Sequence, residues 1–467
     1  MTVTLAQPLT ANTGAVRPLD SAVQPAAPPR APVNSETPLM EKFVIEGGVP
    51  LTGTVVPAGN KNAALPLLAA SLLTDEELLL HNVPRIRDVE AMVDLLVDLG
   101  VKAEWRGEHT IALRADAVTS TEVDPDLAER IRASFLVAGP LLARFGEALL
   151  SAPGGDVIGR RRLDPHLDAF RALGADVTYD GAIRLTAPDG GLRACDFFMD
   201  EPSVMGTENA LMAAAVTPGS TIIRNAASEP HVQDLARMLV SMGAAIDGIG
   251  SNVMEVHGLD RLGGTEHSVS PDHIEIASFM ALAGVTGGEL RIERCVPEDL
   301  RMIRLVFERL GLRSELDGDD VVVPGEQKLV MARDAGGYQV KVEDGPWPAF
   351  PADLTSIALA LATQSDGTVL IFEKMFENRL VFTDKLVVMG ANIILCDPHR
   401  AVVSGPAPLR GARVESPDIR AGMAMLIAAL CADGVSQIGN ITQIDRGYER
   451  IDERLRSLGA RIERVAA

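Results

Sequence analysis

The loop at residues 151–166 carries the side chains best suited to chemistry. Its sequence, SAPGGDVIGRRRLDPH, places Asp156 directly after two glycines and ahead of three consecutive arginines at 160–162. Glycines let a backbone approach a ligand closely, and clustered guanidinium groups fit the oxygens of phosphates and carboxylates. The pattern indicates a bound anion beside a carboxyl group. An isolated run of arginines is also typical of a solvated turn that binds nothing.

Other polar residues stand just ahead of apolar segments. Lys61 and Asn62 precede the apolar run 63–73, and the segment 201–209 (EPSVMGTEN) leads into the apolar run 209–216. At the N-terminus of a buried helix, backbone N–H groups favour an anion, although a side chain there often only caps the helix. The repeated placement predicts one shared pocket. Further candidates of this kind are Ser203, Thr207, Asp353, Arg379, Asp418, Arg420 and Arg446.

The elements that must position these residues repeat along the chain. A helical apolar pattern that ends in Leu-Gly or Met-Gly and is followed by an alternating strand recurs about every 70 residues. Glycine at that place is the left-handed residue that stops a helix. We therefore expect six α/β units of one kind, with the helices ending at Gly100, Gly174, Gly243, Gly311, Gly390 and Gly459.

Each unit also has a helix that is apolar on nearly all sides, which predicts an interior position. Three units are expected to form one globule, so the chain has two similar halves. The pattern restarts at 60–61 and near Pro271, which are the expected junctions, and a cleft between the halves is the expected ligand site. Residues 1–39 have few charges and no periodicity, and we expect them to be a disordered leader.

Composition excludes several classes of function. The 467 residues carry a formal net charge of −21, which disfavours nucleic acid and anionic membranes as partners. No signal peptide is evident, and the apolar run 421–432 is too short to cross a bilayer. A cytoplasmic protein is the expectation. Without CxxC spacing, buried free thiols are expected at Cys195, Cys295, Cys396 and Cys431.

Several motifs occur in order along the chain: PAGNKNAALP, IRASFLVAGPLLARFG, the PGG-xxIG-xR loop, EPSV-x-x-TEN, PAFPAD, FENR and IDRGYERI. Together they resemble the UDP-N-acetylglucosamine enolpyruvyl transferases of the EPSP synthase-like family. The resemblance implies an α/β fold, a two-domain inverse α/β barrel with three βαβαββ-type units in each domain. It implies one domain of residues 40–60 plus 271–465 and another of residues 61–270, which carries the 151–166 loop.

The resemblance also implies an activity. Enzymes of this kind transfer the enolpyruvyl group of phosphoenolpyruvate to the 3′-hydroxyl of UDP-N-acetylglucosamine and release phosphate, the first committed step of peptidoglycan synthesis. The expected partners are these two small molecules, with no nucleic acid, no membrane, and no metal or organic cofactor; the sequence does not predict an oligomeric state. Asp353 is implied as the base for the sugar hydroxyl and Asp156 as the acid that protonates C3 of phosphoenolpyruvate.

The implied contacts carry over residue by residue. Those to phosphoenolpyruvate fall on Lys61, Asn62, Arg161 and Arg446, with Arg379, Asp418 and Arg420 in support. Those to the UDP-sugar fall on Arg132, Arg161, Arg162, Leu163, Asp164, Pro165, Glu201, Pro202, Ser203, Val204, Asp353 and Met375.

The chain departs from the family pattern at Asp156. Most relatives have a cysteine there, which forms a thioether with the epoxide fosfomycin, so resistance to that antibiotic is expected. Smaller departures are the arginines that flank Arg161, the pair Met205-Gly206, and His273 in place of an arginine. Two alternatives stay open: a sister enzyme acting on shikimate 3-phosphate or another nucleotide, and a non-catalytic paralogue that binds UDP-sugar.

Overall fold

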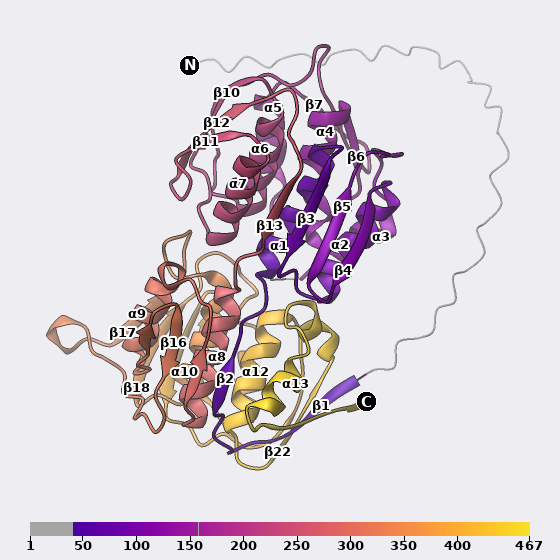
Figure 1. Ribbon diagram of the computed structural model, residues 1–467. Coiled ribbons are helices and arrows are strands. Elements are labelled where there is room, and N and C mark those ends of the chain that lie inside the picture. Colours follow the sequence, from indigo (N-terminus) through magenta and orange to yellow (C-terminus); the bar gives the residue numbers. More distant parts are fainter. Residues whose placement is uncertain (1–40, 157) are drawn as a thin grey trace, which may run out of the picture. The chain divides into compact units, whose positions relative to one another are not determined.

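The computed structural model describes residues 41–156 and 158–467 of the chain. The predicted leader, residues 1–39, lies outside the described residues. The described part mixes helices with six small sheets, of which five have four strands and one has three. The predicted α/β class is therefore confirmed (Figure 1).

Two units show the repeat as continuous βαβαββ segments. In each unit the first and second strands are parallel, and the other neighbouring strands are antiparallel. The order of the strands across the sheet is first, second, fourth, third. One unit comprises β9 (Asp196–Phe198), α6 (Val204–Ala215), β10 (Gly219–Arg224), α7 (Pro230–Ser241), β11 (Ala245–Asp247) and β12 (Val253–Gly258). The other comprises β17 (Val340–Glu343), α10 (Thr355–Ala362), β18 (Gly367–Phe372), α11 (Thr383–Val388), β19 (Asn392–Asp397) and β20 (Arg400–Gly405).

Three sheets are completed by strands from distant parts of the sequence. In Figure 1 the indigo strands β1 and β2 lie among orange and yellow elements. The first sheet joins β21 (Arg413–Glu415), β22 (Val435–Gly439), β1 (Glu41–Glu46) and β23 (Arg461–Ala466). The second joins β15 (Glu315–Asp317), β16 (Asp320–Val323), β14 (Leu290–Ile292) and β2 (Gly53–Val55). The third joins β13 (Thr265–Ser268), β3 (Glu77–His81), β5 (Thr110–Arg114) and β4 (Lys102–Gly107).

The remaining unit has a shorter sheet. It contains three strands, and an isolated parallel bridge between Glu122 and Leu149 stands where the other units have a fourth. The short helix α3 (Pro125–Arg130) follows that bridge and is capped by Asp124. The strands are β6 (Glu147–Leu150), β8 (Ile183–Thr186) and β7 (Asp176–Tyr179).

The amphipathic helices end where the glycine pattern predicts. The six glycines have φ between 94° and 114°, a left-handed conformation that side chains with a Cβ rarely adopt. In each case a strand begins within a few residues, so the predicted sixfold repeat is confirmed. These helices are α2 (Arg87–Asp98), α5 (Asp164–Ala172), α7, α9 (Arg301–Arg309), α11 and α13 (Ile451–Ser457).

The apolar helices lie in the interior, as predicted. Their residues are buried on nearly all sides because sheets and the amphipathic helices enclose them. Two boundaries differ from the apolar runs: the helix at 61–69 gives way to a 3₁₀ turn at 70–73, and α6 begins at Val204, five residues before the run 209–216. The interior helices are α1 (Lys61–Ala69), α4 (Ala138–Phe145), α6, α8 (His273–Thr286), α10 and α12 (Ile419–Cys431).

Buried apolar side chains form two separate clusters. One spans residues 63–269, and the other combines residues 43–55 with 274–462. The chain passes between them twice, and the two passages touch: Asn60 N donates to Ser270 O at 2.7 Å and Asp272 N donates to Ala58 O at 2.9 Å. The division into two domains with the boundaries given above stays a prediction.

The cysteine prediction is partly wrong. All four thiols are free, but only Cys295 is buried, while Cys195 and Cys431 are half-buried. Cys396 is exposed because it lies on β19, which is an edge strand of its sheet. Within the described ranges, no helix combines the length and apolar character needed to cross a membrane.

Candidate active site

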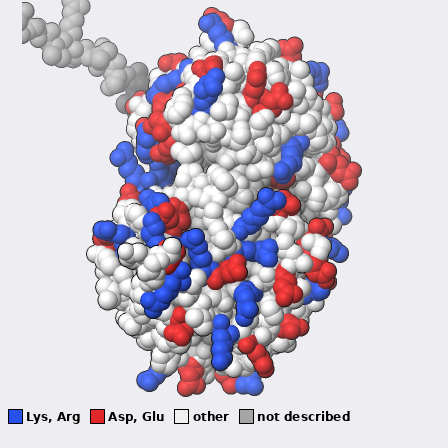
Figure 2. Space-filling model, turned by 90° about the vertical axis from the view of Figure 1, so that its left-hand side faces the viewer, with Lys and Arg blue, Asp and Glu red and all other residues white. Residues whose placement is uncertain are grey.

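A cavity of about 260 Å³ collects six of the charged residues that the sequence singled out. It is lined by residues at or next to the N-termini of interior helices, among them Lys61 of α1, Val204 of α6, His273 of α8 and Ile419 of α12. Helix N-termini carry partial positive charge, so their convergence favours an anionic ligand. On the face shown in Figure 2, lysine and arginine side chains gather across the middle.

Asp88 of α2 joins two of the predicted anion-binding cations. Its carboxylate accepts from Lys61 Nζ at 2.7 Å and from Arg446 Nε at 2.8 Å. Burial alone would raise the pKa of Asp88, but the two cations outweigh it and lower that pKa below its usual range. Lys61 begins α1, whose apolar residues belong to the 63–269 cluster, whereas Arg446 follows Ile444 of the other cluster, so Asp88 ties distant segments together.

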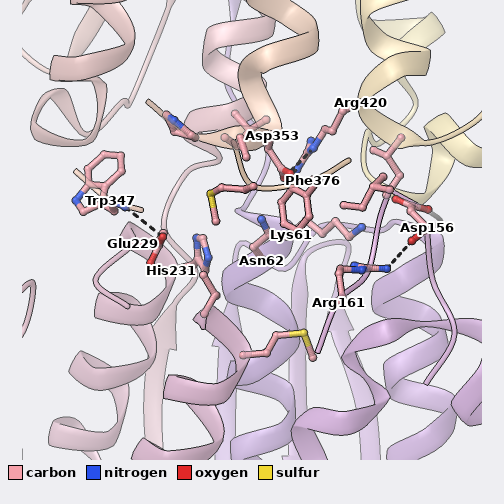
Figure 3. Close-up of a pocket in the computed structure, with 18 of the residues that line it drawn as sticks. Lys61, Asn62, Asp156, Arg161, Glu229, His231, Trp347, Asp353, Phe376 and Arg420 are labelled. Atoms are coloured by element: carbon pink, nitrogen blue, oxygen red, sulfur yellow. Dashed lines mark hydrogen bonds and ion pairs between the residues drawn. The ribbon is translucent and has the colours of Figure 1, made fainter. Parts of the chain in front are cut away.

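Asp156 lies on the glycine-rich loop, with Arg161 beside it in Figure 3. Its carboxylate accepts from Arg446 Nη1, and its backbone carbonyl accepts from Arg161 Nη2 at 2.7 Å. Both preceding residues must be glycine: a Cβ on Gly154 would lie 1.8 Å from the carbonyl oxygen of Glu129, and Gly155 has φ of 102°. Burial lowers the pKa of Arg161, although the nearby Asp156 partly offsets this.

Asp353 is held between two buried arginines. Its oxygens accept from Arg379 Nη2 at 2.8 Å and from Arg420 Nη2 at 2.9 Å. Burial would raise the pKa of Asp353, but Arg420 and Arg379 outweigh it and hold that pKa well below its usual range. The same arrangement raises the pKa of Arg420, which also donates to Tyr448 Oη at 3.2 Å. Asp353 therefore faces the cavity as a carboxylate with low proton affinity, and it is not a simple helix cap.

Nine of the predicted site residues line the same cavity, and two more line an adjoining one. The adjoining cavity, of about 480 Å³, shares Asp156 and adds Asp418 and Arg446. The nine residues are Lys61, Asn62, Asp156, Arg161, Val204, Asp353, Met375, Arg379 and Arg420.

The other predicted residues lie behind or beside this cavity. Arg132 donates to the carbonyl oxygens of Arg161 at 2.8 Å and Arg162 at 3.3 Å, so it braces the loop. Burial, with repulsion from Arg161, lowers the pKa of Arg132 to about 10. Arg162 pairs with Asp164 at 3.2 Å and with Glu201 at 3.4 Å, which links the two segments implied in nucleotide binding. The segment 163–165 begins α5, and Pro202 lies just ahead of α6.

Several polar residues prove to be caps. Asn60, and neither Lys61 nor Asn62, accepts from the first N–H groups of α1. Ser203 caps α6 and Asp418 caps α12 through their side chains. Thr207 is fully buried, where its hydroxyl accepts from Ala227 N at 2.9 Å.

The cavity also contains residues that were not among the predicted site residues, although Glu208 and Phe376 stand within the motifs EPSV-x-x-TEN and FENR. Glu208, Glu229, His231, Trp347 and Phe376 line it together with the predicted residues. Asp88 was missed as well. An acidic residue in the first turn of an amphipathic helix indicates a buried ion pair only once its partner is known. His231 and Glu229 stand in the segment ASEPHVQD, which shows no pattern beyond an ordinary helix start.

Away from this cavity, three side chains lie close enough together to be considered as metal ligands. Oxygen and nitrogen atoms of Glu108, His109 and Glu449 lie within 4.8 Å of one another. Arg450 already pairs with Glu108 at 2.7 Å and with Glu449 at 3.7 Å, so a cation there would meet a resident positive charge. These residues do not line the cavity described above.

The fold agrees with comparisons to known proteins. Residues 45–455 match the family described as EPSP synthase (3-phosphoshikimate 1-carboxyvinyltransferase). The chain therefore belongs to the EPSP synthase family of enolpyruvyl transferases.

Its similarity to one branch of that family is high. It is 56% identical over 424 residues to UDP-N-acetylglucosamine 1-carboxyvinyltransferase of Bradyrhizobium diazoefficiens, covering 91% of this chain and 98% of the relative. The protein of the same name from Treponema denticola is 52% identical, with 91% and 99% covered.

Solved structures share the fold at lower identity. The enolpyruvyl transferase NikO of Streptomyces tendae aligns with a TM-score of 0.81 at 26% identity, over 92% of this chain and all of that one (100%). EPSP synthase of Acinetobacter baumannii aligns with a TM-score of 0.70 at 18% identity, over 91% and 100% of the two chains. The predicted enolpyruvyl transferase fold is confirmed.

Proposed function

We propose that this chain is a transferase that moves the enolpyruvyl group of phosphoenolpyruvate to the 3′-hydroxyl of UDP-N-acetylglucosamine, with release of phosphate, in peptidoglycan synthesis. The observation that carries the proposal is the convergence of Lys61, Arg161 and Arg446 around Asp156, with Asp353 on the same cavity. The relatives that are about half identical and bear this enzyme's name support the choice of acceptor.

The cations are suited to hold phosphoenolpyruvate. Its phosphate and carboxylate groups need several charge-assisted hydrogen bonds in a site that excludes water. Lys61, Arg161 and Arg446 supply them, with Asn62 beside Lys61. Lys61 and Arg446 are tied to Asp88, so the substrate's oxygens must share or replace that carboxylate.

Asp156 is the proposed donor of a proton to C3 of the enolpyruvyl group. The proton adds to C3, and C2 gains cationic character. The sugar 3′-hydroxyl attacks C2, and the tetrahedral adduct then loses its C3 proton together with phosphate to give the enol ether. Asp156 is bonded to Arg446 in the unliganded structure. An incoming phosphate competes for that arginine, which frees Asp156 to carry the proton.

Asp353 is the proposed acceptor of the hydroxyl proton. Its low proton affinity makes it a weak base toward a free alcohol. A hydroxyl oxygen that has bonded to a cationic carbon becomes strongly acidic, however, so a weak base suffices once attack is under way. Arg379 and Arg420 hold the carboxylate in one orientation for this transfer.

The UDP-sugar is proposed to lie along the two segments that Arg162 links, 161–165 and 201–204, with Arg132 bracing the first. Met375 and Asp353 would also contact the sugar. Both lie within residues 274–462, which contribute to the second hydrophobic cluster. We further propose that residues 61–270, and residues 40–60 with 271–465, act as two domains around the substrates.

Phosphate release tests the proposal. Purified protein should release phosphate from phosphoenolpyruvate with UDP-N-acetylglucosamine, and not with shikimate 3-phosphate or with phosphoenolpyruvate alone. Release with shikimate 3-phosphate would indicate the sister activity. Binding of the UDP-sugar without any release would indicate a non-catalytic paralogue.

A further inference from the structure

One end of the cavity is lined by acidic and imidazole side chains in place of arginines. In Figure 3, Trp347, Glu229 and His231 lie together at the left, and Arg161 with Asp156 lies at the right. The rings of His231 and His273 are stacked with centroids 6.2 Å apart, and His273 lies 6.0 Å from Trp347. Glu208 lines the same cavity from α6.

This end contains polar atoms that lack partners. Among the described residues, no hydrogen-bond partner is found for Glu208 Oε1, Glu229 Oε2 or His231 Nδ1, and all three atoms are buried. Glu208 and His231 are only 1% and 6% exposed. Unpaired buried polar atoms are costly, so three of them on one cavity wall point to a ligand that pairs with them.

The two histidines of this group are uncharged at neutral pH, and burial raises the pKa of both Glu208 and Glu229 above the usual range. Burial lowers the pKa of His231 to about 3 and that of His273 to about 4. Burial raises the pKa of Glu208, which the nearby Glu229 raises further. The charged groups that act on the two imidazoles are Asp353, Asp234 and Arg420, and their effects partly cancel.

The tautomer of His273 follows from its neighbour. Nδ1 lies 3.1 Å from the side-chain amide nitrogen of Asn60, which can only donate. His273 therefore accepts at Nδ1 and carries its proton on Nε2, where it is a donor. Neutral donors and acceptors on one wall match a hydroxyl or amide group, which both donates and accepts, better than a phosphate.

We propose that Glu208, Glu229, His231 and His273, called here the neutral subsite, bind an uncharged hydroxyl or acetamido group of the acceptor sugar and determine which sugar is accepted. This inference rests on the proposed function, because it assigns part of that acceptor to part of the cavity. Trp347 adds an aromatic face, which suits the C–H groups of a sugar ring. A site built to hydrogen-bond a substrate group discriminates strongly against analogues that lack it.

Two substitutions at His231 separate hydrogen bonding from packing. His231→Leu removes the ring nitrogens, and we expect the KM for UDP-N-acetylglucosamine to rise about tenfold, the effect of one lost hydrogen bond, with the KM for phosphoenolpyruvate unchanged. His231→Asn keeps a polar atom near Nδ1 and should restore most of the affinity. His257, exposed on β12, provides the matched control, and His257→Leu should change neither constant.

A second variant tests the opposite helix. His273→Asn keeps an acceptor for Asn60 and removes the Nε2 donor, so it should raise the sugar KM several-fold. Wild type should prefer UDP-N-acetylglucosamine over UDP-glucose, which lacks the acetamido group, and over UDP-N-acetylgalactosamine, its C4 epimer. In His273→Asn at least one of these two preferences should fall.

The outcomes are separable. If wild-type protein releases phosphate but both histidine variants keep the wild-type sugar KM and selectivity, the neutral subsite is refuted alone. The same holds if both substrates' KM values rise together. If wild-type protein releases no phosphate with UDP-N-acetylglucosamine, the proposed function itself fails, and the neutral subsite fails with it.

Discussion

The tie between Asp88 and its two cations makes a quantitative prediction for Asp88→Asn. The side chains of Asp88 and Lys61 are 6% and 9% exposed, so removing the carboxylate charge leaves a buried ammonium group without its partner. Breaking a buried ion pair in this way costs about 3–5 kcal/mol. Because Arg446 keeps its bond to Asp156, we expect a loss near the lower end, about 3 kcal/mol in the free energy of unfolding.

Urea unfolding at neutral pH measures this loss directly. The control is Asp168→Asn, which removes an exposed pair with Arg171 and should cost less than about 1 kcal/mol. The cations lower the pKa of Asp88 below 3.8, so its stabilising effect is present above pH 3.8 and disappears as pH falls through the folded-state value. The difference between wild type and Asp88→Asn should shrink accordingly in acid.

Binding of phosphoenolpyruvate provides a second test of Asp88→Asn. With Asp88 neutralised, Lys61 is free for the ligand's oxygens and Arg446 no longer has Asp88 as an anionic partner, so saturating phosphoenolpyruvate should raise the melting temperature of Asp88→Asn more than that of wild type. Equal stability of the two proteins at neutral pH, or equal stabilisation by the ligand, would refute the reasoning.

Three further predictions concern single carboxyl groups. Asp156→Cys should be active and lose activity over minutes with fosfomycin, because it has a thiol at position 156, where wild type has a carboxyl group. A covalent mass shift in fosfomycin-treated wild type would contradict this. Asp353→Asn should lower kcat at least about a hundredfold with less effect on ligand binding, and near-wild-type turnover would exclude it as the proton acceptor. Burial beside Asp344 raises the pKa of Glu373 to about 8 from 4.5, so the folded state loses stability as pH rises between those values. Glu373→Gln should therefore exceed wild type in melting temperature at pH 8 by more than at pH 5, and a pH-independent difference would refute the assignment.

The repeat and the site's main residues could be predicted because they rest on local signals. A glycine after an amphipathic helix, or a lysine before an apolar run, acts through backbone conformation within a few residues. Gly154 and Gly155 belong to the same class, since the loop's geometry requires them.

Contacts between distant residues were not predictable in this way. Asp88 becomes a site residue through its contacts with Lys61 and with Arg446, the latter 358 positions away. Arg132 fitted the pattern of a ligand contact, yet it donates to backbone carbonyl groups of the neighbouring loop. Cys396 was expected inside because its strand is apolar, but an edge strand leaves such residues exposed.

The pairing of β1 and β2 with strands from distant parts of the sequence has a consequence for how the chain folds during synthesis. The sheet that contains β3 receives its last strand, β13, by residue 268, so the sheets of the 63–269 cluster can be complete when little more than half the chain has been made. β2 waits for β14 at residues 290–292, and β1 waits for β22 and β23 at residues 435–439 and 461–466. The first strand to leave the ribosome is thus among the last to find its partners. Until then its apolar residues Phe43 and Ile45, which are fully buried in the folded protein, have no core to enter.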